Sequence, residues 1–401
     1  MKRARTYEQI KDLIDHCKAG RLFDVQNWIS AGKPVNPPVI AEKKNRRRSP
    51  LQIAIDCGFH SLVQVLLEAG AITEEPRYSP LEHALTKRRL DLVQLLERHG
   101  AGIRSVDMKS VFDTWDPGII EFFIRKGADV ERSNPLAYAL SYRIRTALGI
   151  FKRYKNCFLS FQEQANIALR YHCKEGNLKW VSLMLWAGAD PYAKGPDSPD
   201  SEPDFEWDRN ALELAAEYEH YDVFKLKAIR LDPKHPDCQE LLQLACYADK
   251  SDFLRELLDK GFNPNDSGNS GSSLIQSLLQ SIAWSVSPYS RGPNKNIDTP
   301  RSREKIKMIH LLVKCGAKWI PKNQTEINDA RRSLLRMSPD YTVEFIWIMS
   351  KFNGCSREHA EQLMRTPSIR ALVSKYHSRI DELMETFQPA NNPISSTEEE
   401  R

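Results

Sequence analysis

Two stretches of the sequence decide the fold: SPLQIAIDCGFHSLVQVLLEAGA, Ser49–Ala71, and SPLEHALTKRRLDLVQLLERHGA, Ser79–Ala101. The second stretch keeps most of the apolar letters of the first and changes the charged ones. Apolar positions that recur while polar positions vary indicate that the same buried face is required twice. The chain is therefore expected to contain a structural repeat.

The first copy has the pattern of two short helices. Ser49 can cap free backbone amides, and Pro50 suits the first helical position, where no N–H is needed. Gly58 and Gly70 are placed to end the two helices, because glycine tolerates a positive φ. Residues 62–67 put apolar side chains on one face. Each helix of about ten residues is too short to persist alone in water, so a neighbouring copy must cover its apolar face.

Both copies resemble the ankyrin repeat, a unit of about 33 residues with a turn and two antiparallel helices. The family pattern begins Thr-Pro-Leu-His, continues through Ala and Gly, and closes with Val-x-x-Leu-Leu-x-x-Gly-Ala. The first copy matches it at Ser49, Pro50, Leu51, Ala54, Gly58, Val63, Leu66, Leu67, Gly70 and Ala71. The second copy matches it at Ser79, Pro80, Leu81, Ala84, Val93, Leu95, Leu96, Gly100 and Ala101.

The pattern's histidine is missing from this chain. Its places are taken by Gln52, Glu82, Ala137 and Glu213. In the family that imidazole ties the turn to its neighbour by hydrogen bonds. The resemblance therefore implies a divergent array, in which local stability varies from unit to unit.

Weaker copies extend the pattern upstream and downstream of these two. We expect an all-α ankyrin-repeat solenoid of about nine helix-turn-helix units with variable finger loops. The array is expected over residues 1–352, with its clearest units at 49–76, 79–104, 161–192 and 239–266. Residues 353–388 are expected to form a C-terminal helical cap, since a terminal unit needs a polar outer face. Residues 389–401 have nothing to bury and are expected to form a disordered acidic tail.

Added residues in a solenoid must leave the stack at loops, and three insertions stand out. Segment 37–48 is an enlarged finger that ends in Lys43, Lys44, Arg46, Arg47 and Arg48. This cluster can neutralise phosphates or an acidic protein surface, or it is simply a solvated face. Segment 193–209 is an acidic loop in which Phe205 and Trp207 can anchor a basic partner, or which is likewise only solvated. Segment 286–304 separates the two helices of one unit and is expected to be flexible.

Charge and cysteine usage narrow the class of protein. The net charge is +5, and residues 1–50 carry twelve Lys/Arg against five Asp/Glu. The eight cysteines form no Cys-x-x-Cys pair, and five lie in apolar helical pattern. Those five are expected to be reduced, buried thiols: Cys57, Cys157, Cys173, Cys246 and Cys315. We see neither a secretory signal nor an apolar run of about 18–20 residues, and we expect a cytoplasmic protein, or a nuclear one in a eukaryote.

Motifs for catalysis and metal binding are not found. The sequence contains no Gly-x-x-x-x-Gly-Lys, no Gly-x-Ser-x-Gly and no His-Glu-x-x-His. His172 with Cys173, and His235 with Cys238, do not complete a set of four zinc ligands at suitable spacing. We therefore expect no enzymatic activity, no cofactor, no metal and no small-molecule substrate.

The family resemblance implies a non-catalytic scaffold or adaptor that presents a concave surface to another protein. A regulatory subunit of an enzyme or larger complex is a special case of this role. The candidate partner-binding residues are Lys43, Lys44, Arg46, Arg47, Arg48, Lys87, Arg88, Arg89, Tyr138, Tyr142, Phe205, Trp207 and Tyr218. The alternative is a nucleic-acid-associated protein that uses the basic N-terminal half, but the net charge is small and no recognition motif supports it. No membrane partner is expected.

Overall fold

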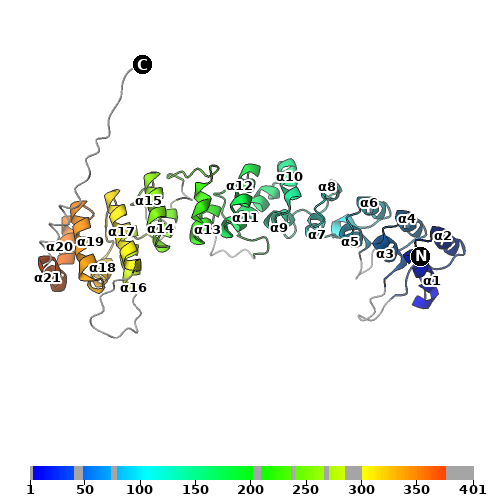
Figure 1. Ribbon diagram of the computed structural model, residues 1–401, viewed down its shortest axis with the longest axis horizontal. Helices are drawn as coiled ribbons and strands as arrows, with labels where there is room; N and C mark the ends of the chain where they lie inside the picture. The colour runs from blue at the N-terminus through cyan, green and yellow to red at the C-terminus, as the bar shows by residue number, and fades with distance from the viewer. Residues whose placement is uncertain are drawn as a thin grey trace, which may run out of the picture. The chain divides into compact units, whose positions relative to one another are not determined.

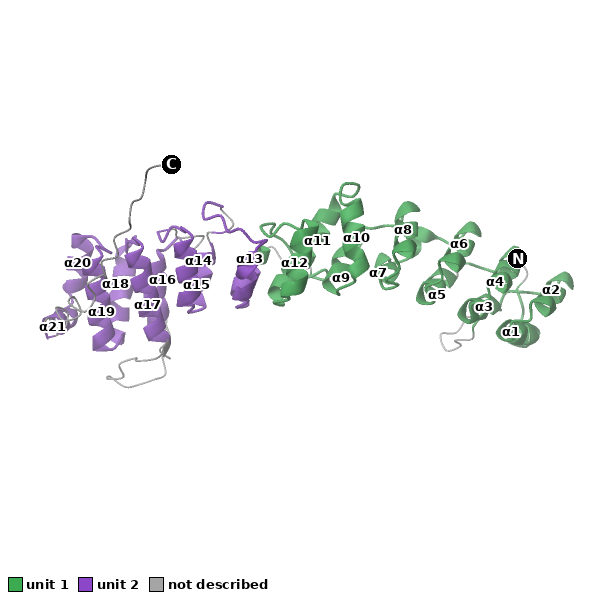
Figure 2. Ribbon diagram, turned by 45° about the horizontal axis from the view of Figure 1, so that its top comes forward, with its two compact units in different colours: residues 1–211 green, residues 212–401 purple. Residues whose placement is uncertain are grey.

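The expected all-α class is confirmed. The computed structural model describes residues 3–39, 48–73, 79–201, 209–235, 238, 240–265, 271–284 and 300–375. In these ranges the regular elements are helices, and β pairing is limited to isolated bridges. The chain divides into two compact units, unit 1 over residues 1–211 and unit 2 over residues 212–401 (Figure 2).

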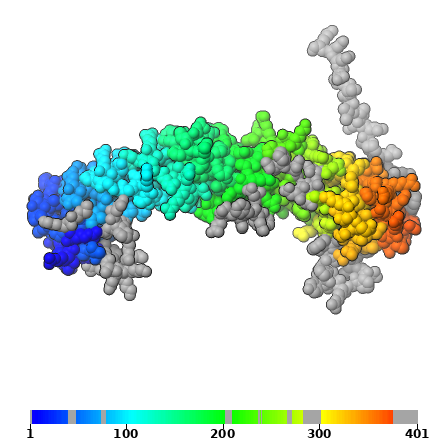
Figure 3. Space-filling model, turned by 180° about the vertical axis from the view of Figure 1, so that it is seen from behind, coloured from blue at the N-terminus to red at the C-terminus, as the bar shows by residue number. Residues whose placement is uncertain are grey.

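Unit 1 consists of successive helix pairs. Its elements are η1 Tyr7–Ile10, α1 Lys11–Lys18, α2 Leu22–Ser30, α3 Pro50–Cys57, α4 His60–Glu68, α5 Pro80–Thr86, α6 Leu90–Arg98, η2 Ile103–Ser105, α7 Met108–Phe112, α8 Pro117–Arg125, α9 Pro135–Ser141, α10 Arg145–Tyr154, α11 Ser160–Lys174 and α12 Leu178–Ala187 (Figure 1). We call the odd-numbered members of these pairs first helices and the even-numbered members second helices. Each first helix packs on the next first helix, from α1 through α11. Figure 3 is coloured by residue number, and within unit 1 the colours follow one another in bands because successive helix pairs lie next to each other.

The predicted helix starts and stops in the first copy are confirmed. The Ser49 side chain accepts a hydrogen bond from the Gln52 amide, and Pro50 is the first residue of α3. Gly58 ends α3 with a φ of 74°. The predicted apolar face of α4 is buried at Leu62, Val63, Leu66 and Leu67. Capping and packing therefore act together, as short helices require.

Carboxamide side chains connect neighbouring repeats at their Gly-Ala closures. Asn36 is 2% exposed, and its Nδ2 donates to the carbonyl oxygen of Gly70 at 2.9 Å. Its Oδ1 accepts from the amide of Ile72 at 2.8 Å. We call this pair of bonds around a Gly-Ala closure an amide clamp. It recurs from Asn265 to Gly316 and Lys318, and from Gln162 and Asn166 to Gly188 and Asp190.

Unit 2 continues the pairing. Its elements are α13 Ala211–Glu217, which begins at the last residue of unit 1, η3 Tyr221–Lys225, α14 Glu240–Tyr247, α15 Ser251–Asp259, α16 Leu274–Trp284, α17 Pro300–Lys314, α18 Gln324–Arg336, α19 Pro339–Lys351, α20 Arg357–Met364 and α21 Pro367–Lys375. Helix α16 packs on both α17 and α18, and α20 packs on α18 and α21. Residues 300–304 of the predicted insertion 286–304 belong to α17 and are helical. The rest of that insertion and the tail 389–401 lie outside the described residues.

The expectation for the cysteines is partly wrong. Cys173 and Cys246 are buried, but Cys57, Cys157 and Cys315 are exposed. Cys57 is the last residue of α3 and Cys315 follows the last residue of α17, so the apolar stripe has ended at both positions. All the cysteines are free thiols. In the described part of the chain, no helix has the length and apolar character that crossing a membrane requires.

Candidate functional site

Two of the predicted basic residues converge on one carboxylate. Arg48 Nη1 lies 2.9 Å from Asp56 Oδ2, and Lys87 Nζ lies 3.8 Å from Asp56 Oδ1. His83 Nδ1 lies 3.3 Å from the same Oδ1. Asp56 therefore offsets part of the positive charge that the sequence places here. The other members of the basic finger, Lys43, Lys44, Arg46 and Arg47, lie outside the described residues.

Arg88 and Arg89 are adjacent in sequence but differ in their contacts. Arg89 donates to Asp91 through Nε at 2.8 Å and Nη2 at 2.6 Å. The hydrogen bond from Arg89 lowers the pKa of the Asp91 carboxyl. Arg89 also donates to the carbonyl of Gly58 at 3.3 Å, so its role is structural. Arg88 is exposed and has a φ of 53°, and its guanidinium forms no hydrogen bond or ion pair with a described residue.

The structure brings Tyr138 of α9 and Tyr142, which follows that helix, together with Lys109 of α7 and with Asp113. The rings of Tyr138 and Tyr142 have centroids 4.6 Å apart, and Tyr142 is 56% exposed. The Tyr138 hydroxyl donates to Asp113 at 3.3 Å, and Lys109 Nζ lies 5.2 Å from the Tyr138 ring. Burial, reinforced by the Asp113 charge, raises the pKa of Tyr138. We call Lys109, Asp113, Tyr138 and Tyr142 the first-helix surface.

Tyr218, the remaining aromatic candidate, lies in unit 2. It follows the last residue of α13 and is 46% exposed. Phe205 and Trp207, the aromatic candidates of the acidic insertion, lie outside the described residues.

The described part of the acidic insertion, residues 193–201, folds back onto unit 1. The Asp200 carboxylate pairs with Lys109 Nζ of the first-helix surface at 2.8 Å. Asp197 pairs with Lys174 Nζ on α11 at 2.7 Å. In the described part of the loop, two carboxylates therefore have cationic partners in the same chain.

A buried arginine anchors the base of this loop. Arg170 on α11 is fully buried and donates through Nε to the carbonyl of Pro196 at 2.7 Å and through Nη1 to that of Ala193 at 2.8 Å. Its Nη2 donates to Glu163 at 2.6 Å. A Cβ on Gly195 would lie 2.7 Å from Nη2, so only glycine permits this approach. The guanidinium is thus saturated by fixed acceptors, as a buried charge requires.

Sequence reasoning missed Lys109, Lys174 and Arg170. Arg170 had a detectable signal, since this charged residue directly follows the apolar residues Ile167, Ala168 and Leu169 of α11. The two lysines look like ordinary surface residues, and their partners lie 91 and 23 residues away. Among the described residues, no three His, Cys, Asp or Glu side chains gather closely enough to hold a metal ion.

Comparison with known proteins agrees with the repeat pattern. No protein-family model matches the sequence. The chain is 26% identical over 160 residues to the ankyrin repeat and KH domain-containing protein mask-1 of Caenorhabditis elegans, a match that spans 37% of this chain and 6% of that protein. Among solved structures, the human ASB11 ankyrin repeat domain aligns with 18% identity and a TM-score of 0.37, covering 58% of this chain and 96% of that one. The similarity to mask-1, with the repeated caps, closures and helix pairs, supports the description of this chain as a divergent ankyrin-repeat protein.

Proposed function

We propose that the chain is a non-catalytic scaffold or adaptor whose first-helix surface in unit 1 binds an acidic segment of a partner protein. Similarity to ankyrin-repeat proteins supports a protein–protein interaction domain in general. The observation that carries the specific proposal is the contact of the chain's own acidic loop with Lys109 of this surface, next to a second contact with Lys174 on α11. A surface that accommodates one acidic segment has the charge and shape to accommodate another.

The loop's outer contact is weak enough to be displaced. Asp200 is 57% exposed in its pair with Lys109. An exposed ion pair of this kind contributes about 0–1 kcal/mol, because water and salt screen it. The Arg170 contacts at the base of the loop are buried and should persist. A partner with several carboxylates can therefore replace the Asp200 contact while the base of the loop stays folded.

Site-specific photo-cross-linking tests this proposal. Tyr142, on the first-helix surface, is replaced by p-benzoylphenylalanine, and the matched control carries the same group at Trp186, which is 67% exposed on second helix α12. In native-cell extract we expect a partner to cross-link at position 142 and not at 186. The double variant Asp197→Asn/Asp200→Asn should increase the yield at 142, because the loop then competes less. Equal yields at the two positions, or no gain in the double variant, would contradict the proposal.

The nucleic-acid alternative has less support. Arg48 and Lys87 share Asp56, and Arg89 is engaged with Asp91, so less of the predicted basic charge is available for phosphates. A regulatory subunit of an enzyme or larger complex remains a special case of the scaffold, in which the cross-linked partner is that enzyme or complex.

A further inference from the structure

The turns between first and second helices in unit 1 share one unusual backbone position. Each turn contains a residue with a positive φ, in the left-handed region that favours glycine. In three turns this residue is Gly20, Gly58 or Gly176. In the three consecutive turns α5–α6, α7–α8 and α9–α10 it is Arg88, Trp115 and Arg143, with φ values of 53°, 59° and 68°. We call these three residues the turn strip.

Glycine would relieve backbone strain at each position of the turn strip, because a Cβ is crowded in this conformation. Strain that persists is offset either by contacts of the strained side chain or by the packing of the structure around the turn. These side chains make few such contacts: Trp115 is 47% exposed, and both arginines are exposed. Neither the Arg88 nor the Arg143 guanidinium forms a hydrogen bond or ion pair with any residue in the described ranges. Packing of the flanking helices therefore holds these turns, and the two guanidinium groups and the indole stay available to a ligand.

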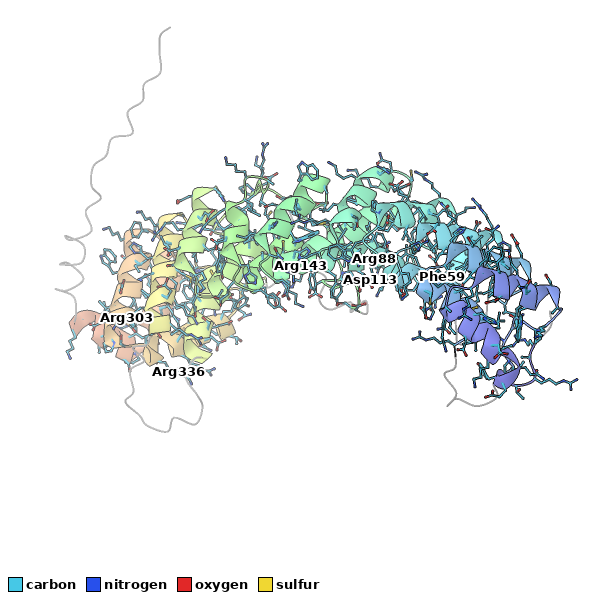
Figure 4. All side chains as sticks on the ribbon, turned by 45° about the vertical axis from the view of Figure 1, so that its right-hand side comes forward. Phe59, Arg88, Asp113, Arg143, Arg303 and Arg336 are labelled. Carbon is cyan, nitrogen blue, oxygen red and sulfur yellow. The ribbon has the colours of Figure 1, made fainter. Side chains whose placement is uncertain are left out.

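The turn strip follows the packing of the first helices. Helix α5 packs on α7, and α7 packs on α9. In Figure 4 Arg143 lies further along unit 1 than Arg88 and Asp113, and Asp113 lies two residues before Trp115 in the same turn. Packed helix axes are about 8–10 Å apart, so the two arginines are separated by about 16–20 Å. An extended peptide rises about 3.3 Å per residue and spans this distance in five or six residues.

The surface is hollowed at the Arg143 end of the turn strip. A cavity of about 520 Å³ is lined by Arg143, Tyr171, His172, Glu175 and Asn177, with Gly176 and Leu178. The turn strip thus runs from an exposed guanidinium, past an exposed indole, to a second guanidinium beside a polar cavity. A ligand chain that follows it has room to continue into this cavity.

We propose that the turn strip docks an extended segment of a partner protein in which two acidic residues flank an apolar one. Arginine pairs with carboxylates through two parallel hydrogen bonds, which fixes position as well as charge. Tryptophan is an effective anchor for an apolar side chain at an interface. The expected ligand therefore has its acids five or six positions apart, with the apolar residue near the middle. This proposal does not depend on the first-helix surface.

The test is a selection of peptides on the full-length chain. A displayed library of random dodecapeptides is selected against the wild type, after removal of peptides that bind the triple variant Arg88→Gly/Trp115→Gly/Arg143→Gly. We expect enrichment of peptides with two acids five or six positions apart around an apolar residue. Fluorescein-labelled copies should bind the triple variant at least tenfold more weakly than the wild type. No acidic enrichment, or equal binding to both proteins, overturns the proposal.

Stability measurements separate binding from folding in this test. Glycine relieves the strained φ, so each substitution should leave the melting temperature unchanged or raise it by about 2–4 °C. The matched control is Ser133→Gly, which removes another exposed residue with a positive φ of 62° and should not affect peptide binding. Loss of binding in this control also overturns the proposal. Tighter binding of labelled 20-base-pair DNA than of any peptide, lost in the triple variant, would assign the turn strip to phosphates instead.

Discussion

At the scale of single residues, His172 shows how a polar ring is kept inside unit 1. Its Nε2 lies 3.0 Å from the carbonyl oxygen of Leu140, which can only accept, so Nε2 carries the proton. The ring stacks on Trp180 at 5.4 Å, and Nδ1 has no hydrogen-bond partner among the described residues. Burial, with a smaller contribution from the charge of Arg143, lowers the pKa of His172 to about 4.

This lowered pKa predicts acid sensitivity. Unfolded His172 binds a proton near its ordinary pKa of 6.5, whereas the folded residue binds one only near pH 4. Between these values the unfolded chain binds more protons, so stability present above pH 6.5 is lost as the pH falls towards 4. The full loss from this residue is about 3 kcal/mol. Urea midpoints measured from pH 7.5 to 4 should fall more steeply for the wild type than for His172→Gln, and parallel curves would refute the assignment.

The cysteines predict a pattern of chemical labelling. Burial raises the pKa of Cys17 and of Cys246 to about 12, so neither thiol is ionised or accessible in the folded chain. Cys57 and Cys157 are exposed. Brief treatment with iodoacetamide at pH 8 should modify Cys57 and Cys157 first, as read by peptide mass spectrometry, with Cys17 and Cys246 following only in urea. Modification of all four at similar rates in the native protein would show that these helices are not packed as described.

At the scale of elements, the amide clamp predicts that Asn36 holds two neighbouring repeats of unit 1 together. Asn36→Asp removes the Nδ2 donor and faces a carboxylate towards the Gly70 carbonyl oxygen. Because this site is 2% exposed, we expect a loss on the order of 1–3 kcal/mol and faster hydrogen exchange at Ile72. Asn265→Asp is the matched control, since Asn265 makes the same bonds at an exposed site and water can replace the donor. An equal cost at the two sites would argue against burial as the cause.

The short elements were predictable from sequence where cap and stop residues are explicit. Ser49, Pro50 and Gly58 fixed one helix because each satisfies a local backbone requirement. At Arg88 and Trp115 the same turn forms without glycine, since packing of the flanking helices outweighs the strain of one residue. Local patterns could not place Arg170 against the carbonyls of residues 193 and 196, because that contact depends on the path of a loop. The candidate site was therefore found only in part: Tyr138 and Tyr142 were predicted, and Lys109 was not.

At the scale of the whole molecule, the helix contacts of the described part of unit 1 join each helix pair to its neighbours in sequence. Destabilisation in such an array should spread to adjacent pairs and fade beyond them. Leu136 on α9 is fully buried, so Leu136→Ala should cost about 2–5 kcal/mol. Hydrogen exchange should accelerate in α7, α9 and α11 and stay unchanged in α1 and α2. Uniform acceleration over all of unit 1 would mean that the unit unfolds as a single cooperative body.

The amide clamps at Asn36 and Asn265 are expected to differ in how long they resist chemical degradation. A clamp needs an intact carboxamide, and asparagine is among the side chains that degrade with heat and time. Loss of ammonia from asparagine proceeds through attack by the backbone nitrogen of the next residue. Asn36 precedes Pro37, whose nitrogen bears no hydrogen and is blocked, whereas Asn265 precedes Asp266 and keeps that route. As the protein ages, the closure at Gly316 should therefore loosen before the closure at Gly70. The cause would be deamidation of Asn265, which needs no mutation.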